Sequence, residues 1–157
     1  MAQAALEISE VDPASPEAAD LISALDRDLR ARYPGLQVNG IDVPSFRVAG
    51  GVFLVGHLAG EGVACGALRP MEPGAVEVKH MYVRDPHRGR GFGRAMLAAL
   101  ERIAIERAYR VIRLETGGSQ PEAIALYESA GYQTIPCYGD HVSDPRSLCF
   151  QKQLSGA

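Results

Sequence analysis

The sequence predicts an α+β domain with a central mixed, mostly antiparallel sheet. Residues 52–83 are dominated by strand-like segments with a turn near residue 60, which is typical of an antiparallel meander. An amphipathic helix follows, and then a second apolar strand at residues 110–116. Because such crossovers are right-handed and return parallel, residues 110–116 should pair in parallel with residues 76–83. We expect about six or seven strands and about four helices in one layered domain.

The composition fits one soluble globular domain spanning residues 1–157. Hydrophobic residues make up 46% and charged residues 22%, and the net charge is −3. An acidic chain is not expected to bind nucleic acid. The sequence shows neither the basic and apolar regions of a signal peptide nor an apolar run of about 20 residues, so no membrane association is expected and the predicted location is cytoplasmic.

Three cysteines, an odd and unpatterned set, are too few for a disulfide framework or a zinc site. Reduced thiols are therefore expected. No metal site is predicted.

The first fifty residues predict one strand and one helix. Residues 6–11 alternate as a half-buried strand does, and Ser15 followed by Pro16 is a typical helix start. The helix should end before Tyr33. The glycine- and proline-rich segment at residues 33–45 then predicts a connection, with Asn39 and Asp42 as its polar candidates. An ordinary surface connection and a specific binding role are both open for it.

The middle and the end of the chain alternate strands and helices. Residues 52–58 and 62–68 predict a hairpin, and residues 76–83 predict the central strand, which Pro86 terminates. Beyond the crossover strand, a short helix is expected from Gln120 to Ala130, capped by Gly131. Two further strand-like runs, residues 132–138 and 147–154, flank a polar loop at residues 139–146.

Between the central strand and the amphipathic helix lies a glycine-rich, basic turn, Arg88-Gly89-Arg90-Gly91-Phe92-Gly93. The first turn of a helix presents unpaired N–H groups and the positive end of the helix dipole, and glycines allow an anion to approach the backbone. A P-loop would need Lys-Ser/Thr where Arg94-Ala95 stands, and a dinucleotide fingerprint would need a glycine at Arg94 or Met96. The turn therefore predicts a diphosphate site of another kind.

Arg88-Gly89-Arg90-Gly91-Phe92-Gly93 fits the pattern Arg/Gln-x-x-Gly-x-Gly/Ala and resembles the loop with which the GCN5-related N-acetyltransferase (GNAT) superfamily binds the pyrophosphate of acetyl-CoA. Residues 123–132 also resemble that family, whose pattern reads Asn-x-x-Ala-x-x-Leu-Tyr followed shortly by Gly-Phe/Tyr. Gln120 stands where Asn is common, so a contact carried over from that position is in doubt. The resemblance covers most of residues 53–154.

The resemblance implies a GNAT-like fold in which the two parallel strands splay apart at the acetyl-CoA site. It also implies an acetyl-CoA-dependent N-acetyltransferase that acts by direct attack of a primary amine in a ternary complex. In the family, the pantetheine arm pairs with the splayed strand and the loop holds the pyrophosphate, largely through backbone N–H groups. The cofactor-binding residues it implies here are Met81, Tyr82, Val83, Arg88, Gly89, Arg90, Gly91, Phe92, Gly93, Arg94 and Gln120.

Two residues are candidates for the chemistry. The resemblance places Tyr127 near the CoA sulfur, where it could protonate or stabilise the thiolate; a core tyrosine is the alternative. Glu77 lies eleven residues before Arg88, where histone-acetylating relatives carry a glutamate base. Its alternative is a solvated strand glutamate paired with Lys79. His80 should point to the opposite face from Glu77 unless the strand is bulged.

Other functions remain open. Transfer of another acyl group, such as succinyl, would use the same fold, and a non-catalytic acyl-CoA-binding module would not need Tyr127 and Glu77. A nucleotide-binding protein is disfavoured by the missing glycine and lysine. Cys137 with His141 could suggest an acyl-enzyme, but no orienting third group is evident.

The resemblance implies a small-molecule or peptide amine as acceptor, which the sequence does not identify further. Acidic residues near a cleft, Asp42, Glu77 and Asp140, would suit a cation. Family members often form homodimers, and nothing here marks an interface.

Overall fold

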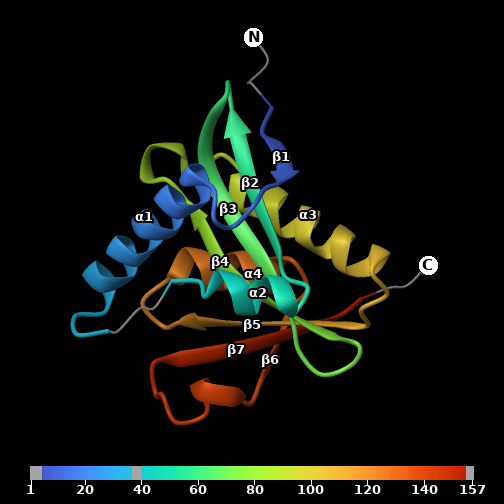
Figure 1. The fold of residues 1–157 in the computed structure, drawn as a ribbon. Coiled ribbons are helices and arrows are strands. Elements are labelled where there is room, and N and C mark those ends of the chain that lie inside the picture. The colour runs from blue at the N-terminus through green and yellow to red at the C-terminus, as the bar shows by residue number, and fades with distance from the viewer. Residues whose placement is uncertain (1–4, 37–39, 155–157) are drawn as a thin grey trace.

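The protein, a computed structural model that describes residues 5–36 and 40–154, forms one seven-stranded sheet with helices on both faces. The sheet order is β1-β2-β3-β4-β5-β7-β6, and β4 and β5 are its parallel pair (Figure 1). The elements are β1 (Glu7–Glu10), α1 (Pro16–Arg32), α2 (Val43–Val48), β2 (Val52–Leu58), β3 (Glu61–Pro70), β4 (Ala75–Val83), α3 (Phe92–Glu106), β5 (Val111–Gly117), α4 (Pro121–Ser129), β6 (Gln133–Ile135) and β7 (Ser147–Gln153). Two single 3-10 turns, η1 (Asp85–His87) and η2 (Gly139–His141), interrupt the loops. The predicted mixed, mostly antiparallel sheet is confirmed.

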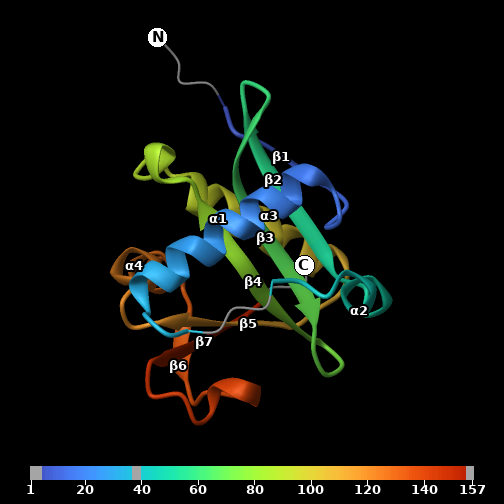
Figure 2. The ribbon, with the colours of Figure 1, turned by 60° about the vertical axis from the view of Figure 1, so that its left-hand side comes forward.

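Helices α1 and α2 cover one face of the sheet, and α3 and α4 cover the other. The apolar residues of α1 and Phe46 of α2 pack with Phe53 and Val55, whereas the buried side of α3 packs with Val76 and Val78. Figure 2, with α1 in front of the strands and α3 behind them, shows the same layering. In β2, Val52 and Leu54 belong to the core under α3, and Phe53 and Val55 belong to the core under α1. Successive residues of this strand thus point to opposite faces of the sheet, as strand geometry requires.

Local signals set the ends of several elements as expected. Ser15 caps α1 by accepting a hydrogen bond from the Ala18 N–H at 3.3 Å, and Pro16 is the first helical residue. Gly131 follows α4 with φ of 95°, a left-handed conformation that glycine adopts without strain. The predicted hairpin, central strand, crossover helix and crossover strand are all present within two or three residues of their expected ends.

Helix α2 was not expected. It lies at the end of the segment read as a connection, where Asp42 accepts a hydrogen bond from the Ser45 N–H and caps the helix. Pro44 in the first turn and a single apolar anchor, Phe46, give a six-residue helix too little periodicity to be recognised. Asn39, the other polar candidate of this segment, lies outside the described residues.

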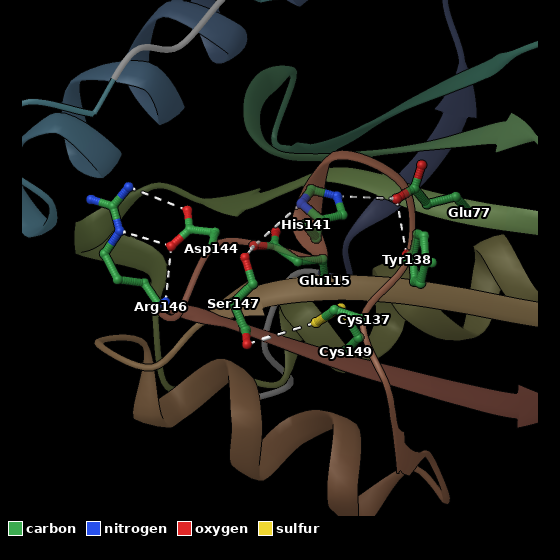
Figure 3. Close-up of a disulfide and its surroundings, with 9 residues drawn as sticks. All are labelled: Glu77, Glu115, Cys137, Tyr138, His141, Asp144, Arg146, Ser147 and Cys149. Carbon is green, nitrogen blue, oxygen red and sulfur yellow. Dashed lines mark hydrogen bonds and ion pairs between the residues drawn. A yellow bond between two sulfur atoms is a disulfide. The ribbon is translucent and has the colours of Figure 1, made fainter.

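The prediction that the cysteines are reduced thiols is wrong for two of them. Cys137 and Cys149 form a disulfide between the segment after β6 and strand β7, while Cys65 is free and buried (Figure 3). The two residues are 12 apart in sequence, and their Cα atoms are 5.1 Å apart across an antiparallel strand pair. The sequence lacked this information because the pairing depends on the β6–β7 register, which places Ile135 opposite Cys149.

Candidate active site

A β-bulge in β4 shapes the centre of the site. Opposite β3, Lys79 pairs with Ala67 and Tyr82 pairs with Cys65, so β4 carries one more residue than its partner over this span. His80 takes up the extra length with φ of 57°. Such a bulge was the condition for Glu77 and His80 to share a face of the strand, and both residues line one cavity of about 570 Å³.

Strands β4 and β5 pair at one end and separate at the other. Their parallel register runs from Ala75 opposite Val111 to Val78 opposite Leu114 and stops there, although β4 continues to Val83 and β5 to Gly117. Beyond Val78, β4 is hydrogen-bonded only to β3, and its edge toward β5 is left without a strand partner in the described structure. The predicted splayed parallel pair is confirmed, and it exposes backbone groups that an extended ligand could pair with.

The glycine-rich turn presents backbone N–H groups at the start of α3. Gly89 and Gly91 have φ of 78° and 82°, and an added Cβ at either position would meet no atom within 4 Å. Gly91 is the N-cap of α3, and among the described residues no hydrogen bond is formed by the N–H groups of Gly89, Arg90 or Gly91. Together with the first N–H groups of this 15-residue helix, they form an open cradle for an anion.

The arginines of this turn have different surroundings. Arg88 donates from Nε to the Val83 carbonyl at 2.8 Å and lies over the Tyr82 ring, so it braces the end of β4 against the turn. Arg94 donates to the Ser129 hydroxyl at 2.6 Å, which links α3 to α4. Arg90 is exposed. The guanidinium groups of Arg88 and Arg94 thus hold the cradle in shape, and backbone groups dominate its interior.

Tyr127 projects from α4 into the splayed region. The residue is 5% exposed, lines the cavity, and packs edge-on against Tyr132. Burial, with a smaller contribution from the carboxylate of Glu115, raises the pKa of Tyr127 well above its usual value. The phenol therefore stays protonated at any physiological pH and can donate a hydrogen bond, but it cannot act as a base.

Glu77 is a buried carboxylate, 7% exposed, on the floor of the same cavity. It accepts a hydrogen bond from the Tyr138 hydroxyl at 2.9 Å, and its Oε1 lies 4.0 Å from Lys79 Nζ. The Lys79 pairing named as the alternative is thus present, but burial and the tyrosine contact show that Glu77 is not merely a solvated surface residue. Burial and the adjacent Glu77 raise the pKa of Tyr138, so this hydroxyl remains a donor.

The polar loop expected at residues 139–146 completes this side of the cavity with Asp140 and His141. Because Cys137 is bonded to Cys149, it has no thiol to act with His141 as the nucleophile of an acyl-enzyme. Between β6 and β7 the loop carries His141, whose ring lies between Glu77 of β4 and Glu115 of β5 (Figure 3). Glu115 in turn accepts a hydrogen bond from the Ser147 hydroxyl at 2.6 Å. These contacts join residues up to 64 positions apart in sequence, and only the alternation of β5 could have hinted that Glu115 shares a face with Glu77.

His80 differs from the other groups in the cavity because its charge is suppressed. Burial, and then the nearby Lys79 ammonium, lower the pKa of His80 to about 4. Its imidazole is therefore neutral at neutral pH. His80 and Glu77 are both available as acceptors of a proton in the site.

Gln120 lies in the cavity wall, at the N-cap of α4. Its side-chain oxygen accepts hydrogen bonds from the Gly117 N–H at 3.2 Å and from the hydroxyls of Thr116 and Tyr33. Tyr33 also accepts from the Ser119 N–H at 3.0 Å. The longer amide therefore ties the end of α1 to the turn before α4, and only its –NH₂ group remains to contact a ligand.

The cavity is acidic on balance. The carboxylates that line it are Asp26, Asp42, Glu77, Glu115 and Asp140, against one arginine and one lysine, Arg69 and Lys79. Within residues 5–36 and 40–154, no cluster of three or more His, Cys, Asp or Glu side chains could hold a metal ion. The helices in those same ranges include none that is long and apolar enough to cross a membrane.

A splayed parallel pair, an N–H cradle at a helix start and a cavity between them define an acyltransferase fold of the GNAT type. The chain matches the family model described as Acetyltransferase (GNAT) family over residues 19–132. It is 34% identical over 148 residues to the IAA acetyltransferase of Azospirillum brasilense, which covers 94% of this chain and 97% of the relative. The chain belongs to the GNAT family and is an N-acetyltransferase.

Solved structures agree with this assignment. A Klebsiella pneumoniae protein provisionally described as an acyl-CoA N-acyltransferase is 35% identical with a TM-score of 0.80, over 96% of this chain and 98% of that one. A GNAT family acetyltransferase of Elizabethkingia anophelis, solved with acetyl-CoA bound, gives a TM-score of 0.71 at 16% identity, over 95% and 98% of the two chains. The second comparison shows a shared fold alone.

Proposed function

We propose that the protein transfers the acetyl group of acetyl-CoA to a primary amine by direct attack in a ternary complex. The observation that carries this proposal is that two sets of free backbone groups lie next to each other. They are the N–H cradle at the start of α3 and the edge of β4 that has no strand partner in the described structure. A diphosphate fits the first, and an extended amide-bearing chain fits the second. Acetyl-CoA carries both chemical groups on one molecule.

The cradle would hold the pyrophosphate through the N–H groups from Gly89 to Arg94, with Arg90 adding positive charge from the surface. The backbone of Met81, Tyr82 and Val83 would hold the pantetheine arm in the manner of an added strand. Along the same edge, a backbone N–H would polarise the thioester carbonyl. The –NH₂ group of Gln120, at the N-cap of α4, would add a side-chain donor for this arm.

Tyr127 would assist departure of the thiolate. A thiol has a pKa near 8.5, well below that of this buried phenol, so full proton transfer from Tyr127 to the thiolate is uphill. Tyr127 therefore acts by donating a hydrogen bond to the developing negative charge, which stabilises the leaving group without loss of the phenol proton.

Glu77 would receive the proton that the ammonium of the acceptor must lose. A carboxylate is a weak base toward an ammonium with a pKa near 10, so Glu77 acts through water and also holds the cation in the acidic cavity. His80 is the second candidate for this role, because the bulge brings its neutral imidazole into the same cavity. The excess of carboxylates in the lining favours a cationic amine as acceptor.

Calorimetric titration tests the first part of the proposal. We expect acetyl-CoA and CoA to bind with micromolar affinity and ATP and NAD to bind far more weakly. A panel of amines, assayed by release of free thiol and by a product mass increase of one acetyl group, tests the second part, and succinyl-CoA tests the choice of acyl group. Binding of CoA without turnover of any amine would favour a non-catalytic module instead.

A further inference from the structure

We propose that His141 carries the proton from Glu77 to Glu115 during each turnover; the inference rests on the proposed function, in which Glu77 receives that proton. His141 Nε2 lies 3.8 Å from Glu77 Oε2, and its Nδ1 lies 3.7 Å from Glu115 Oε2. One ring nitrogen therefore faces a carboxylate of β4 and the other faces a carboxylate of β5 (Figure 3).

Glu77 would gain from such an outlet because its own contact with solvent is small. Its side chain is 10% exposed, whereas that of Glu115 is 26% exposed. A buried carboxylate that takes up a proton must release it before the next turnover. His141, whose side chain is 24% exposed, lies between the more buried carboxylate and the more exposed one.

Two hydroxyl groups fix the oxygens that face the ring. Tyr138 donates to Glu77 Oε2 at 2.9 Å, and Ser147 donates to Glu115 Oε2 at 2.6 Å. These are the same oxygens that lie nearest to His141. Tyr138 adjoins the disulfide-bonded Cys137, so the segment that carries both Tyr138 and His141 is tied covalently to β7. The arrangement therefore holds three separate parts of the chain in one order: Glu77, His141, Glu115.

A neutral imidazole has one N–H donor and one lone pair on opposite sides, which suits this order. The ammonium N–H breaks as its proton passes to a water molecule, which gives up one of its own protons to form the O–H of Glu77. That O–H then breaks as Nε2 gains the proton, and Nδ1 passes its own proton to Glu115, which releases it to water. One proton enters and one leaves, and the ring returns to its first tautomer by exchange with solvent. The two gaps must each close by roughly 1 Å to reach hydrogen-bond distance, a change that enzymes commonly make when substrate binds.

The test compares His141→Ala with a matched histidine outside the cavity. His57 also contacts a carboxylate, with Nε2 at 2.7 Å from Glu17 Oε2, but neither residue lines the cavity. We expect His141→Ala to lower kcat/KM for the amine about 100-fold, while the Kd for CoA stays unchanged. Free imidazole added to the assay should restore much of this loss. His57→Ala should retain the wild-type rate and show no response to imidazole.

The second variant, Glu115→Gln, removes the proton acceptor and keeps the shape of the side chain. It should lower kcat without changing the Kd for CoA, and imidazole should not restore it. Full activity of His141→Ala, or a loss that imidazole does not restore while CoA binding is intact, would overturn the proposal. A wild-type enzyme that binds CoA but acetylates no amine would instead overturn the proposed function on which it rests.

Discussion

The two halves of the site are built in different ways. The half assigned to the cofactor is one continuous part of the chain, from the β4 edge at residues 81–83 to the turn at residues 88–94, and offers mainly backbone groups. The half assigned to the acceptor is made of side chains from β4, β5 and the loop before β7, held together by hydrogen bonds and ion pairs across the sheet. Backbone groups keep their positions when most side chains of the first half are replaced. In the second half, replacing one side chain changes the groups that face the acceptor. We infer that the cofactor is fixed by the fold and the acceptor by these side chains.

The largest expected effect falls on the backbone half. Gly91→Glu forces a side chain into a left-handed conformation and adds a negative charge where the cradle would hold a diphosphate. Several charge-assisted hydrogen bonds would be lost, so we expect CoA affinity to fall at least about 1000-fold by calorimetry. Gly74→Glu is the matched control, because Gly74 has φ of 86° with the same open surroundings and lies in the β3–β4 turn. Equal loss of affinity in both variants would show that strain, not the cradle, is responsible.

Breaking the disulfide should disturb the acceptor half of the site. Cleaving Cys137–Cys149 with dithiothreitol, or replacing both residues by serine, frees a loop closed over 12 residues, and the free energy of unfolding should fall by about 3 kcal/mol in urea titrations. The released loop carries Tyr138 and His141, so kcat/KM for the amine should fall as well, with CoA affinity unchanged. Loss of CoA binding on reduction would mean that the two halves are not independent.

Tyr127 lies where the two halves meet. Tyr127→Phe removes one hydrogen bond to the leaving thiolate, and we expect kcat to fall about 50-fold with little change in the KM for acetyl-CoA. Tyr109→Phe, a partly buried tyrosine that does not line the cavity, serves as the control. A normal kcat for Tyr127→Phe would show that Tyr127 is a core residue with no part in catalysis.

The smallest predicted effect concerns His80 and the dependence of the free energy of unfolding on pH. Because its pKa falls from 6.5 to about 4 on folding, the unfolded chain binds more protons between these values, so stability decreases as pH falls through this window. Between pH 7 and pH 5 this histidine alone should cost about 2 kcal/mol of unfolding free energy. His80→Gln should lose that part of the pH dependence in urea titrations. An unchanged slope would show that the imidazole is not held neutral in the bulge.

Much of the fold could be predicted because its signals are local. Alternation, Ser15 with Pro16, and the glycines of the turn before α3 each act within a few residues, and the parallel pairing of β5 with β4 follows from the handedness of crossovers. Helix α2 could not be predicted in this way, because its six residues contain one buried apolar side chain and are too few to show a helical period.

The acceptor half could be predicted only in part. Glu77 was proposed from its sequence separation from the glycine-rich turn, but the bulge at His80 depends on β3–β4 register and was foreseen only as a condition. Tyr138, His141, Glu115 and Ser147 come together through the β5–β7 pairing, which no local pattern specifies. Histidine tolerates positive φ better than most residues, and this was the one local hint of the bulge.

The most direct test of two independent halves is one pair of calorimetric titrations with CoA, on the wild-type protein and on Glu77→Gln. Both proteins should bind CoA with the same micromolar Kd, although amine acetylation by the variant should fall about 100-fold. Absence of CoA binding by the wild type would contradict the assignment of the cradle. A Kd for Glu77→Gln weakened as far as that of Gly91→Glu would contradict the separation of cofactor and acceptor sites.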